Sequence, residues 1–324
     1  MERRRFLTSA SAVAVLAATS SSQAGQLLAE PTYCKLDAHI HLFDPTRKGG
    51  IPWPEPTDAL LYKPALPSRY QAMARQYGIC GAIAIEASPW ASDNDWLLNV
   101  VTQSPFLVGM VGNLDPASPG FAADLERLVR TPLFLGIRYG NLWGRDLFTA
   151  QEKPEFIAGL KALASYGKVF ESANPDLRLL QALNRISDKV PNLRIVADHL
   201  PNAKYTAMES SAYWLQVKEL AAKPQVFAKI SEIPVAHSGA LVIDPGVYQE
   251  RVAGLWESFG ADRVLFGSDW PNSESTASFA DTMRIVAMVA CKLSPQAQQQ
   301  YYALNSRQAY RWQLRTAEQR TLLQ

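Results

Sequence analysis

Two histidines separated by one residue form the sharpest chemical signal in the sequence, in the segment DAHIH that spans 37–41. The segment belongs to a short apolar run, which is typical of a β-strand. Because alternate residues of a strand share a face, we expect His39 and His41 to point the same way. Two adjacent imidazoles can bind one metal ion or one polar group of a substrate. Such a pair also arises by chance, so its position at the end of a predicted strand gives it weight.

A carboxylate and a third histidine end two later apolar runs. Asp269 lies in GSDWP after the run RVLF, and Asp198-His199 follows the run LRIVA. A carboxylate at such a position can act as a general base toward water. Taken alone, Asp269 could equally cap a helix or a turn, and His199 could serve as a structural hydrogen-bonding residue. The remaining histidine, His237, lies in a polar segment, where we expect it on the surface or at a rim.

Other polar and aromatic side chains fall near predicted strand ends. Glu86 lies in an otherwise apolar run, so its burial would require a partner such as a metal ion or Arg138. Arg138 and Lys229 are candidates for stabilising an anion or a polarised carbonyl group. The residues that we expect to contact the substrate are Arg138, Glu171, Lys229 and Trp270. Each has the alternative role of a packing or ion-pair residue at the rim.

Eight short apolar runs carry these residues and alternate with helical patterns. The runs are 36–43, 79–87, 106–114, 133–140, 168–173, 193–200, 226–233 and 263–270. Their near-continuous Val, Ile, Leu and Phe are typical of strands buried on both faces of a parallel sheet. Eight strand–helix units in about 280 residues predict an α/β fold, a (β/α)8 TIM barrel, with functional residues at the carboxyl ends of the strands. An open doubly wound sheet is the alternative, but no glycine-rich phosphate loop follows the first strand.

Six segments between the runs carry apolar residues at three- and four-residue spacing, as amphipathic helices do. They are 68–78, 93–103, 119–130, 154–167, 174–189 and 248–260. A long irregular stretch, 44–67, contains several Pro and Gly residues and follows the first strand. Loops of this length are often functional, and in a barrel this one would overhang the carboxyl-end mouth.

Composition limits the classes of function. The chain of 324 residues is 48% hydrophobic and 19% charged, with a formal net charge of +2. These values exclude a largely disordered chain and provide no electrostatic surface for nucleic acid. The three cysteines, Cys34, Cys80 and Cys291, are far apart and odd in number, which favours unpaired thiols over a disulfide framework.

The first 24 residues have the features of a cleavable export signal. Arg3, Arg4 and Arg5 precede a short apolar run and a small-residue cleavage pattern at 22–24. This arrangement resembles a twin-arginine signal, so we expect the twin-arginine export machinery as a transient partner and a periplasmic or secreted location. Residues 25–324 would then form the mature single-domain barrel. No other stretch approaches about 18 uninterrupted apolar residues, so we expect no membrane insertion.

The motifs together resemble the amidohydrolase-related family. The resemblance runs from Leu36 to about Trp312 and rests on the first-strand HIH, the sixth-strand DH and the eighth-strand GSDWP. Shorter matches, GIRYG, AKISEI and YYALNSRQAYRW, support it. Within that family the chain is most similar to the lactonase branch, which includes sugar-lactone and muconolactone-type hydrolases and 2-pyrone-4,6-dicarboxylate hydrolase.

This resemblance implies a barrel that hydrolyses a cyclic ester. Asp269 would be the general base, and His199 would orient the water or the substrate. One divalent ion, with zinc as the first candidate, would be bound by a set of residues drawn from His39, His41, Asp269 and Glu86. In a metal-free site the histidine pair would instead bind the substrate carbonyl directly. Two metal sites are not expected, because the fourth strand ends in Arg138 and not in the carboxylated Lys or Glu of binuclear members.

Two other functions are compatible with the same motifs. One is decarboxylation, as in metal-dependent decarboxylase relatives that share the HxH pair and the eighth-strand Asp, and the other is binding without catalysis. Few cationic residues fall at strand ends, which favours a neutral or singly charged small-molecule lactone over a dicarboxylate. The sequence gives no indication of the oligomeric state.

Overall fold

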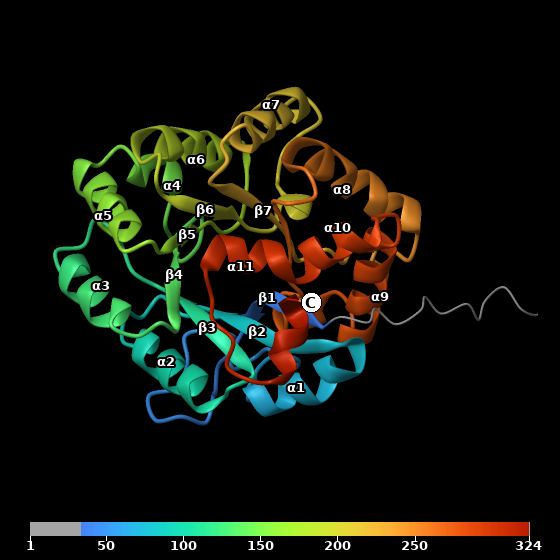
Figure 1. Cartoon of the computed structure of the whole chain (residues 1–324), viewed down its shortest axis with the longest axis horizontal. Coiled ribbons are helices and arrows are strands. Elements are labelled where there is room, and N and C mark those ends of the chain that lie inside the picture. The colour runs from blue at the N-terminus through green and yellow to red at the C-terminus, as the bar shows by residue number, and fades with distance from the viewer. Residues whose placement is uncertain (1–33, 324) are drawn as a thin grey trace, which may run out of the picture. The chain divides into compact units, whose positions relative to one another are not determined.

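The eight apolar runs form one parallel sheet in a computed structural model that describes residues 34–323. The strands are β1 Lys35–His41, β2 Ile79–Ile85, β3 Leu107–Gly112, β4 Phe134–Arg138, β5 Val169–Glu171, β6 Arg194–Ala197, β7 Val226–Ile230 and β10 Val264–Phe266. Each pairs in parallel with the next, and a bridge between Ile40 and Trp270 joins the last strand to the first. The sheet therefore closes into the predicted (β/α)8 barrel (Figure 1).

Helices surround the barrel (Figure 1). The main ones are α1 Pro67–Ala74, α2 Asp93–Gln103, α3 Phe121–Val129, α5 Pro154–Ser165, α6 Leu177–Lys189, α7 Ser210–Ala221, α8 Pro245–Phe259 and α9 Phe279–Ala290. Six of them coincide with predicted segments, although α3 begins two residues after Pro119 and α6 three residues after Asn174. The helices α7 and α9 were not predicted. A short α4, Leu147–Ala150, and α10, Pro295–Gln299, complete the outer layer.

The C-terminal segment covers the amino ends of the strands. Its helix α11, Asn305–Tyr310, lies over the centre of the ring of strands in Figure 1. The side chain of Asn305 donates to the carbonyl of Val264, the first residue of β10, at 2.9 Å. Arg194, which begins β6, donates through Nε to the carbonyl of Ala309 at 2.6 Å. One end of the barrel is thereby closed, and the carboxyl ends of the strands form the other.

Several sequence predictions concern the periphery. The proposed export signal, 1–24, lies outside the described residues. Among the helices described, none is long and apolar enough to cross a membrane. Cys34, Cys80 and Cys291 are present as free thiols. His237 is exposed, as predicted, in a small hairpin of β8, Ala236–His237, and β9, Ala240–Leu241.

Close packing between β4 and β5 requires a glycine at position 136. A Cβ atom there would lie 2.2 Å from the carbonyl oxygen of Val169, which belongs to the paired strand. We expect Gly136→Ala to lower the free energy of unfolding by about 2 kcal/mol, because the overpacked strands must separate. Gly120→Ala is the matched control, since its nearest neighbour, Oδ2 of Asp124, would be 3.8 Å away. Urea unfolding of both variants checks the prediction, which equal stabilities would contradict.

Candidate active site

Two histidines and an aspartate meet where β1 and β10 join. His39 Nε2 lies 3.3 Å from His41 Nε2 and 3.4 Å from Asp269 Oδ1. His41 Nε2 lies 3.2 Å from the same Asp269 oxygen. These three atoms therefore form a nearly equilateral triangle, which we call the His–His–Asp triangle. All three residues are buried, and the alternation along β1 places both imidazoles inside the barrel, as predicted.

Backbone hydrogen bonds hold the triangle together. The amide of Asp269 donates to the carbonyl of His39 at 2.9 Å, and the amide of His41 donates to that of Trp270 at 2.7 Å. Asp37 reinforces this seam, because its Oδ1 accepts from the amides of His39 and Ser268 at 3.0 and 2.9 Å. The closure of the barrel itself thus positions residues that are about 230 apart in sequence.

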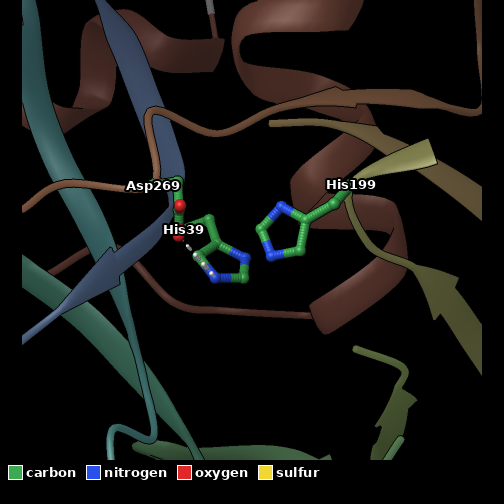
Figure 2. A group of neighbouring side chains, drawn as sticks. All are labelled: His39, His199 and Asp269. Carbon is green, nitrogen blue, oxygen red and sulfur yellow. Dashed lines mark ion pairs between the residues drawn. The ribbon is translucent and has the colours of Figure 1, made fainter. Parts of the chain in front are cut away.

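His199, the third predicted histidine, faces the same site from the end of β6. Its ring centroid is 4.7 Å from that of His39, and Figure 2 shows the ring of His39 between Asp269 and His199. Ser231 Oγ lies 2.8 Å from His199 Nδ1. Ligand atoms of His39, His199 and Asp269 all lie within 4.8 Å of one another. The structure therefore brings together the four residues to which the chemistry was assigned.

Charge states at the site follow from its burial. Burial lowers the pKa of His199 to about 4, although the charge of Asp269 opposes the shift. Burial and the neighbouring Lys229 hold the pKa of His39 well below its usual value. Burial alone would raise the pKa of Asp269, but hydrogen bonds from His41 and Asn272 and the proximity of His199 keep it below its ordinary value. At neutral pH the site therefore presents neutral His39 and His199 beside an ionised carboxylate.

The backbone at the mouth adopts an unusual conformation at five positions. Non-glycine residues with positive φ lie two to five residues beyond the ends of β4, β5, β6, β7 and β10: Trp143 (60°), Asn174 (52°), His199 (55°), Glu232 (52°) and Asp269 (61°). The left-handed region is costly for side chains with a Cβ atom and is found mainly where a site requires it. Its concentration at one end of the barrel marks that end as functional.

Glu86, an expected metal ligand, instead contacts an arginine and an indole in this structure. Its Oε1 accepts from Arg138 Nε at 2.8 Å, its carbonyl accepts from Arg138 Nη2 at 2.9 Å, and its Oε2 accepts from Trp143 Nε1 at 3.2 Å. The third guanidinium nitrogen, Arg138 Nη1, lies 3.5 Å from His39 Nε2. Glu86 thus holds Arg138 with one nitrogen directed at the triangle.

Loss of the Glu86 charge should destabilise the fold. We expect Glu86→Gln to lower the free energy of unfolding by about 3 kcal/mol in urea, because Arg138 would stay buried without its counter-charge. Glu126→Gln is the matched control, since its pair with Arg130 is largely exposed and should contribute at most about 0.5 kcal/mol. Zinc content should be unchanged in Glu86→Gln, whereas loss of bound zinc would assign Glu86 as a ligand.

Three residues expected at the substrate lie elsewhere. Lys229 and Glu171 contact each other in the barrel interior, and neither side chain is exposed. Lys229 Nζ also lies 3.1 Å from Asp198 Oδ1. The indole of Trp270 is fully buried, 5.2 Å from the ring of Tyr70, and donates to the carboxylate of Glu274. The structure therefore does not bring Lys229, Glu171 or Trp270 to the mouth, because the first two face inward below it and Trp270 packs into the core.

An open cleft lies above the triangle. Its polar and aromatic lining consists of His41, Trp53, Arg138, Trp143, Asn174 and Asn272. Trp53 comes from the long loop 44–67, which was predicted to overhang the mouth, and its ring is 5.9 Å from that of His41. Asn174 and Asn272 were not predicted, and their position one to three residues beyond a strand-end motif is the only signal for them in the sequence.

The family model for amidohydrolases matches residues 36–312. The chain belongs to the amidohydrolase family. An L-fucono-1,5-lactonase of Burkholderia ambifaria is 29% identical over 252 residues, which cover 76% of this chain and 83% of the relative. This similarity confirms the resemblance to the lactonase branch, and membership of the family makes the protein a hydrolase.

Solved amidohydrolase structures share the fold. An amidohydrolase of Burkholderia multivorans with bound zinc superposes with a TM-score of 0.77 at 20% identity, over 86% of this chain and all of that one. A 5-carboxyvanillate decarboxylase of Novosphingobium aromaticivorans, complexed with manganese, superposes at 0.62 and 17% identity, over 87% of this chain and 97% of that one. Both likenesses establish the barrel, and neither establishes the reaction.

The residues of this amidohydrolase fit one divalent cation. Tetrahedral zinc with bonds of about 2.0–2.1 Å separates its ligand atoms by roughly 3.3–3.4 Å, which matches the sides of the His–His–Asp triangle. Buried carboxyl groups around the site also outnumber buried cations. The carboxyl groups are Asp37, Glu86, Glu171, Asp198 and Asp269, and the cations are Arg138 and Lys229. Burial raises the pKa of Asp37 and of Asp198, which favours their neutral forms, whereas the lowered pKa of Asp269 keeps this carboxylate charged and able to bind a cation.

Proposed function

We propose that this amidohydrolase opens a lactone ring with a water molecule activated by Asp269. The observation that carries the proposal is the ionised, fully buried carboxylate of Asp269 beside two inward-facing histidines at the mouth of the barrel. A carboxylate that accepts a proton and two groups that polarise a carbonyl are what ester hydrolysis requires. The L-fucono-1,5-lactonase relative supports the same reaction class.

Asp269 would accept a proton when water attacks the lactone and donate it when the ring oxygen departs. Asn272 Nδ2 donates to Asp269 Oδ2 at 2.7 Å, so Oδ1 is the oxygen that faces the histidines. Asp269 takes a proton from water as the water oxygen bonds to the lactone carbonyl carbon. The bond from that carbon to the ring oxygen then breaks, and Asp269 returns the proton to the departing alkoxide. The products are a hydroxyl group and a carboxylic acid, so atoms and charge balance.

Arg138 and His199 would stabilise and orient the reacting atoms. Because Glu86 occupies Nε and Nη2 of Arg138, Nη1 is the nitrogen available to an oxyanion that forms near His39. His199, neutral at pH 7, accepts a hydrogen bond from water through Nε2 in the tautomer whose Nδ1 carries the proton and donates to Ser231 Oγ.

His39, His41 and Asp269 would bind a divalent cation, for which zinc is the first candidate. When bound, it supplies Lewis-acid polarisation of the carbonyl group and lowers the pKa of water. The zinc-bound amidohydrolase structure and the dimensions of the triangle support this assignment.

We propose a neutral sugar-type lactone as the substrate. Among the lining residues of the cleft, Arg138 is the one cation, and Glu86 already neutralises it. The indoles of Trp53 and Trp143 offer apolar faces to a sugar ring, and the amides of Asn174 and Asn272 offer donors and acceptors to hydroxyl groups.

A panel assay tests the function. The purified, zinc-supplemented protein is incubated with L-fucono-1,5-lactone, other aldonolactones and 2-pyrone-4,6-dicarboxylate, and ring opening is followed by proton release. Hydroxylated aromatic acids are assayed in parallel for carbon dioxide release. We expect catalysed opening of neutral sugar lactones. Release of carbon dioxide without any lactone opening would replace the proposal by decarboxylation, and no turnover in either assay would favour a binding protein.

A further inference from the structure

A column of buried side chains runs from the active site down the barrel interior. His39 Nδ1 lies 3.2 Å from Lys229 Nζ, and Lys229 Nζ contacts Glu171 Oε1. The same Glu171 oxygen accepts from the hydroxyl of Tyr310 at 2.5 Å. The side chains of the first three residues are fully buried, and Tyr310 is 2% exposed.

The lowest member of this column belongs to the C-terminal helix. Tyr310 is the last residue of α11, which lies over the opposite end of the barrel from the cleft (Figure 1). Its ring also lies beneath Lys229, with 5.4 Å between the ring centroid and Nζ. Contacts therefore connect the active-site ring of His39 to a helix that lines no part of the cleft.

We propose that Tyr310 is a positioning residue of the active site, which holds Glu171 against Lys229 and, through Lys229, fixes the ring of His39. The proposal rests on the proposed function where activity is the measurement. It assigns to the C-terminal helix a role in reactivity in addition to covering the barrel.

The Glu171 carboxylate has few hydrogen-bond partners, so the Tyr310 hydroxyl has a large share in holding it in place. Its Oε2 has no hydrogen-bond partner among the described residues, so the contacts of Oε1 with Lys229 and Tyr310 carry the solvation of this buried carboxylate. Removing the Tyr310 hydroxyl leaves Lys229 as the sole donor, and the carboxylate must shift toward it or away from it. Either movement displaces Lys229 Nζ relative to His39 Nδ1.

His39 is sensitive to such a displacement because Nδ1 and Nε2 belong to one rigid ring. A His39 ring that binds a metal through Nε2 carries its proton on Nδ1, where Asp198 Oδ2 lies 3.5 Å away, and Lys229 Nζ lies 3.1 Å from the other oxygen of Asp198. Lys229 therefore sets the position of both partners of Nδ1, and outer contacts of this kind typically change metal affinity or activity 10- to 100-fold. Since three contacts connect Tyr310 to His39, we expect its effect at the lower end of this range.

The chain offers a matched control for this test. Tyr301 lies in the same C-terminal segment and is fully buried, but its hydroxyl has no hydrogen-bond partner among the residues described. Tyr310→Phe and Tyr301→Phe therefore remove the same atom from similar surroundings, and only the first breaks the column.

The experiment uses the full chain. For Tyr310→Phe we expect kcat to fall about 10-fold with KM unchanged, and zinc affinity, measured against a competing chelator, to fall about 10-fold. Tyr301→Phe should match the wild type in both. Equal values for the two variants, or a loss of thermal stability alone in Tyr310→Phe, would overturn the proposal.

Two further measurements keep the test decisive. The chain has four histidines, so the ¹⁵N resonances of the His39 ring can be assigned with His39→Asn. We expect a shift of these resonances in Tyr310→Phe but not in Tyr301→Phe, whether or not the wild type opens a lactone. A wild type that opens no lactone would reject the proposed function and leave the role of Tyr310 standing. Should Tyr310→Phe fail to fold, Glu171→Gln, which keeps an acceptor for Tyr310, should displace the same resonances, and unchanged resonances would overturn the proposal.

Discussion

Asp269→Asn should lower kcat/KM for lactone opening by at least about 10³-fold. A general base contributes about 10²- to 10⁴-fold, and this substitution also weakens the His–His–Asp triangle by removing its negative charge. Among the described residues, Asp269 supplies the carboxylate oxygen that lies within 3.4 Å of His39 Nε2 and 3.2 Å of His41 Nε2. The measurement is steady-state proton release with the lactone that the wild type hydrolyses fastest.

A loss of activity in Asp269→Asn is informative only if this variant keeps the fold of the wild type. Asparagine retains an oxygen, although its amide group cannot reproduce every contact of the carboxylate, so circular dichroism and thermal unfolding accompany the assay. Asp262→Asn is the control, because Asp262 is exposed at a turn before β10 and should leave kcat/KM unchanged. Activity within about tenfold of the wild type in Asp269→Asn would remove Asp269 from the mechanism.

Metal removal should have the second largest effect. We expect dialysis against a chelator to lower kcat at least about 100-fold, and one equivalent of zinc to restore it. His39→Asn should not regain activity at the same zinc concentration, because one corner of the triangle is lost. His237→Asn, at the exposed histidine, should behave as the wild type.

The opposite result has a definite meaning. Full activity in protein that contains less than about a tenth of an equivalent of any divalent ion would show that His39 and His41 bind the substrate carbonyl directly. The titration endpoint also measures stoichiometry. A second equivalent of bound zinc would contradict the single site that the ligand set predicts.

The barrel could be predicted because its strands are buried on both faces. Continuous apolar runs such as 79–85 leave few alternatives to a parallel sheet, and strand order then places β1 beside β10. The meeting of His39 with Asp269 follows from that closure. The helix α9 was missed although FADTMRIVAMVA carries an N-terminal signal, since the side chain of Ser278 accepts from the amide of Asp281.

The direction of individual side chains was harder to predict. Asp269 lies three residues beyond the end of β10 with a φ of 61°, so the alternation of strand residues does not apply there, and Trp270 packs into the surrounding core. Lys229 precedes the end of β7 by one residue and consequently lies below the mouth. The partners of Glu86 and Glu171 come from Arg138 and Tyr310, 52 and 139 residues away, and no local pattern encodes such contacts.

Hydrolysis in ¹⁸O-labelled water tests the central claim most directly. The wild type is given the best lactone of the panel at less than one equivalent, and the opened product is analysed by mass spectrometry after one turnover. Our account predicts one ¹⁸O atom, located in the new carboxylate, and no labelled product from Asp269→Asn in the same time. Carbon dioxide as the product, or an opened acid without the label, would contradict water attack on a lactone carbonyl.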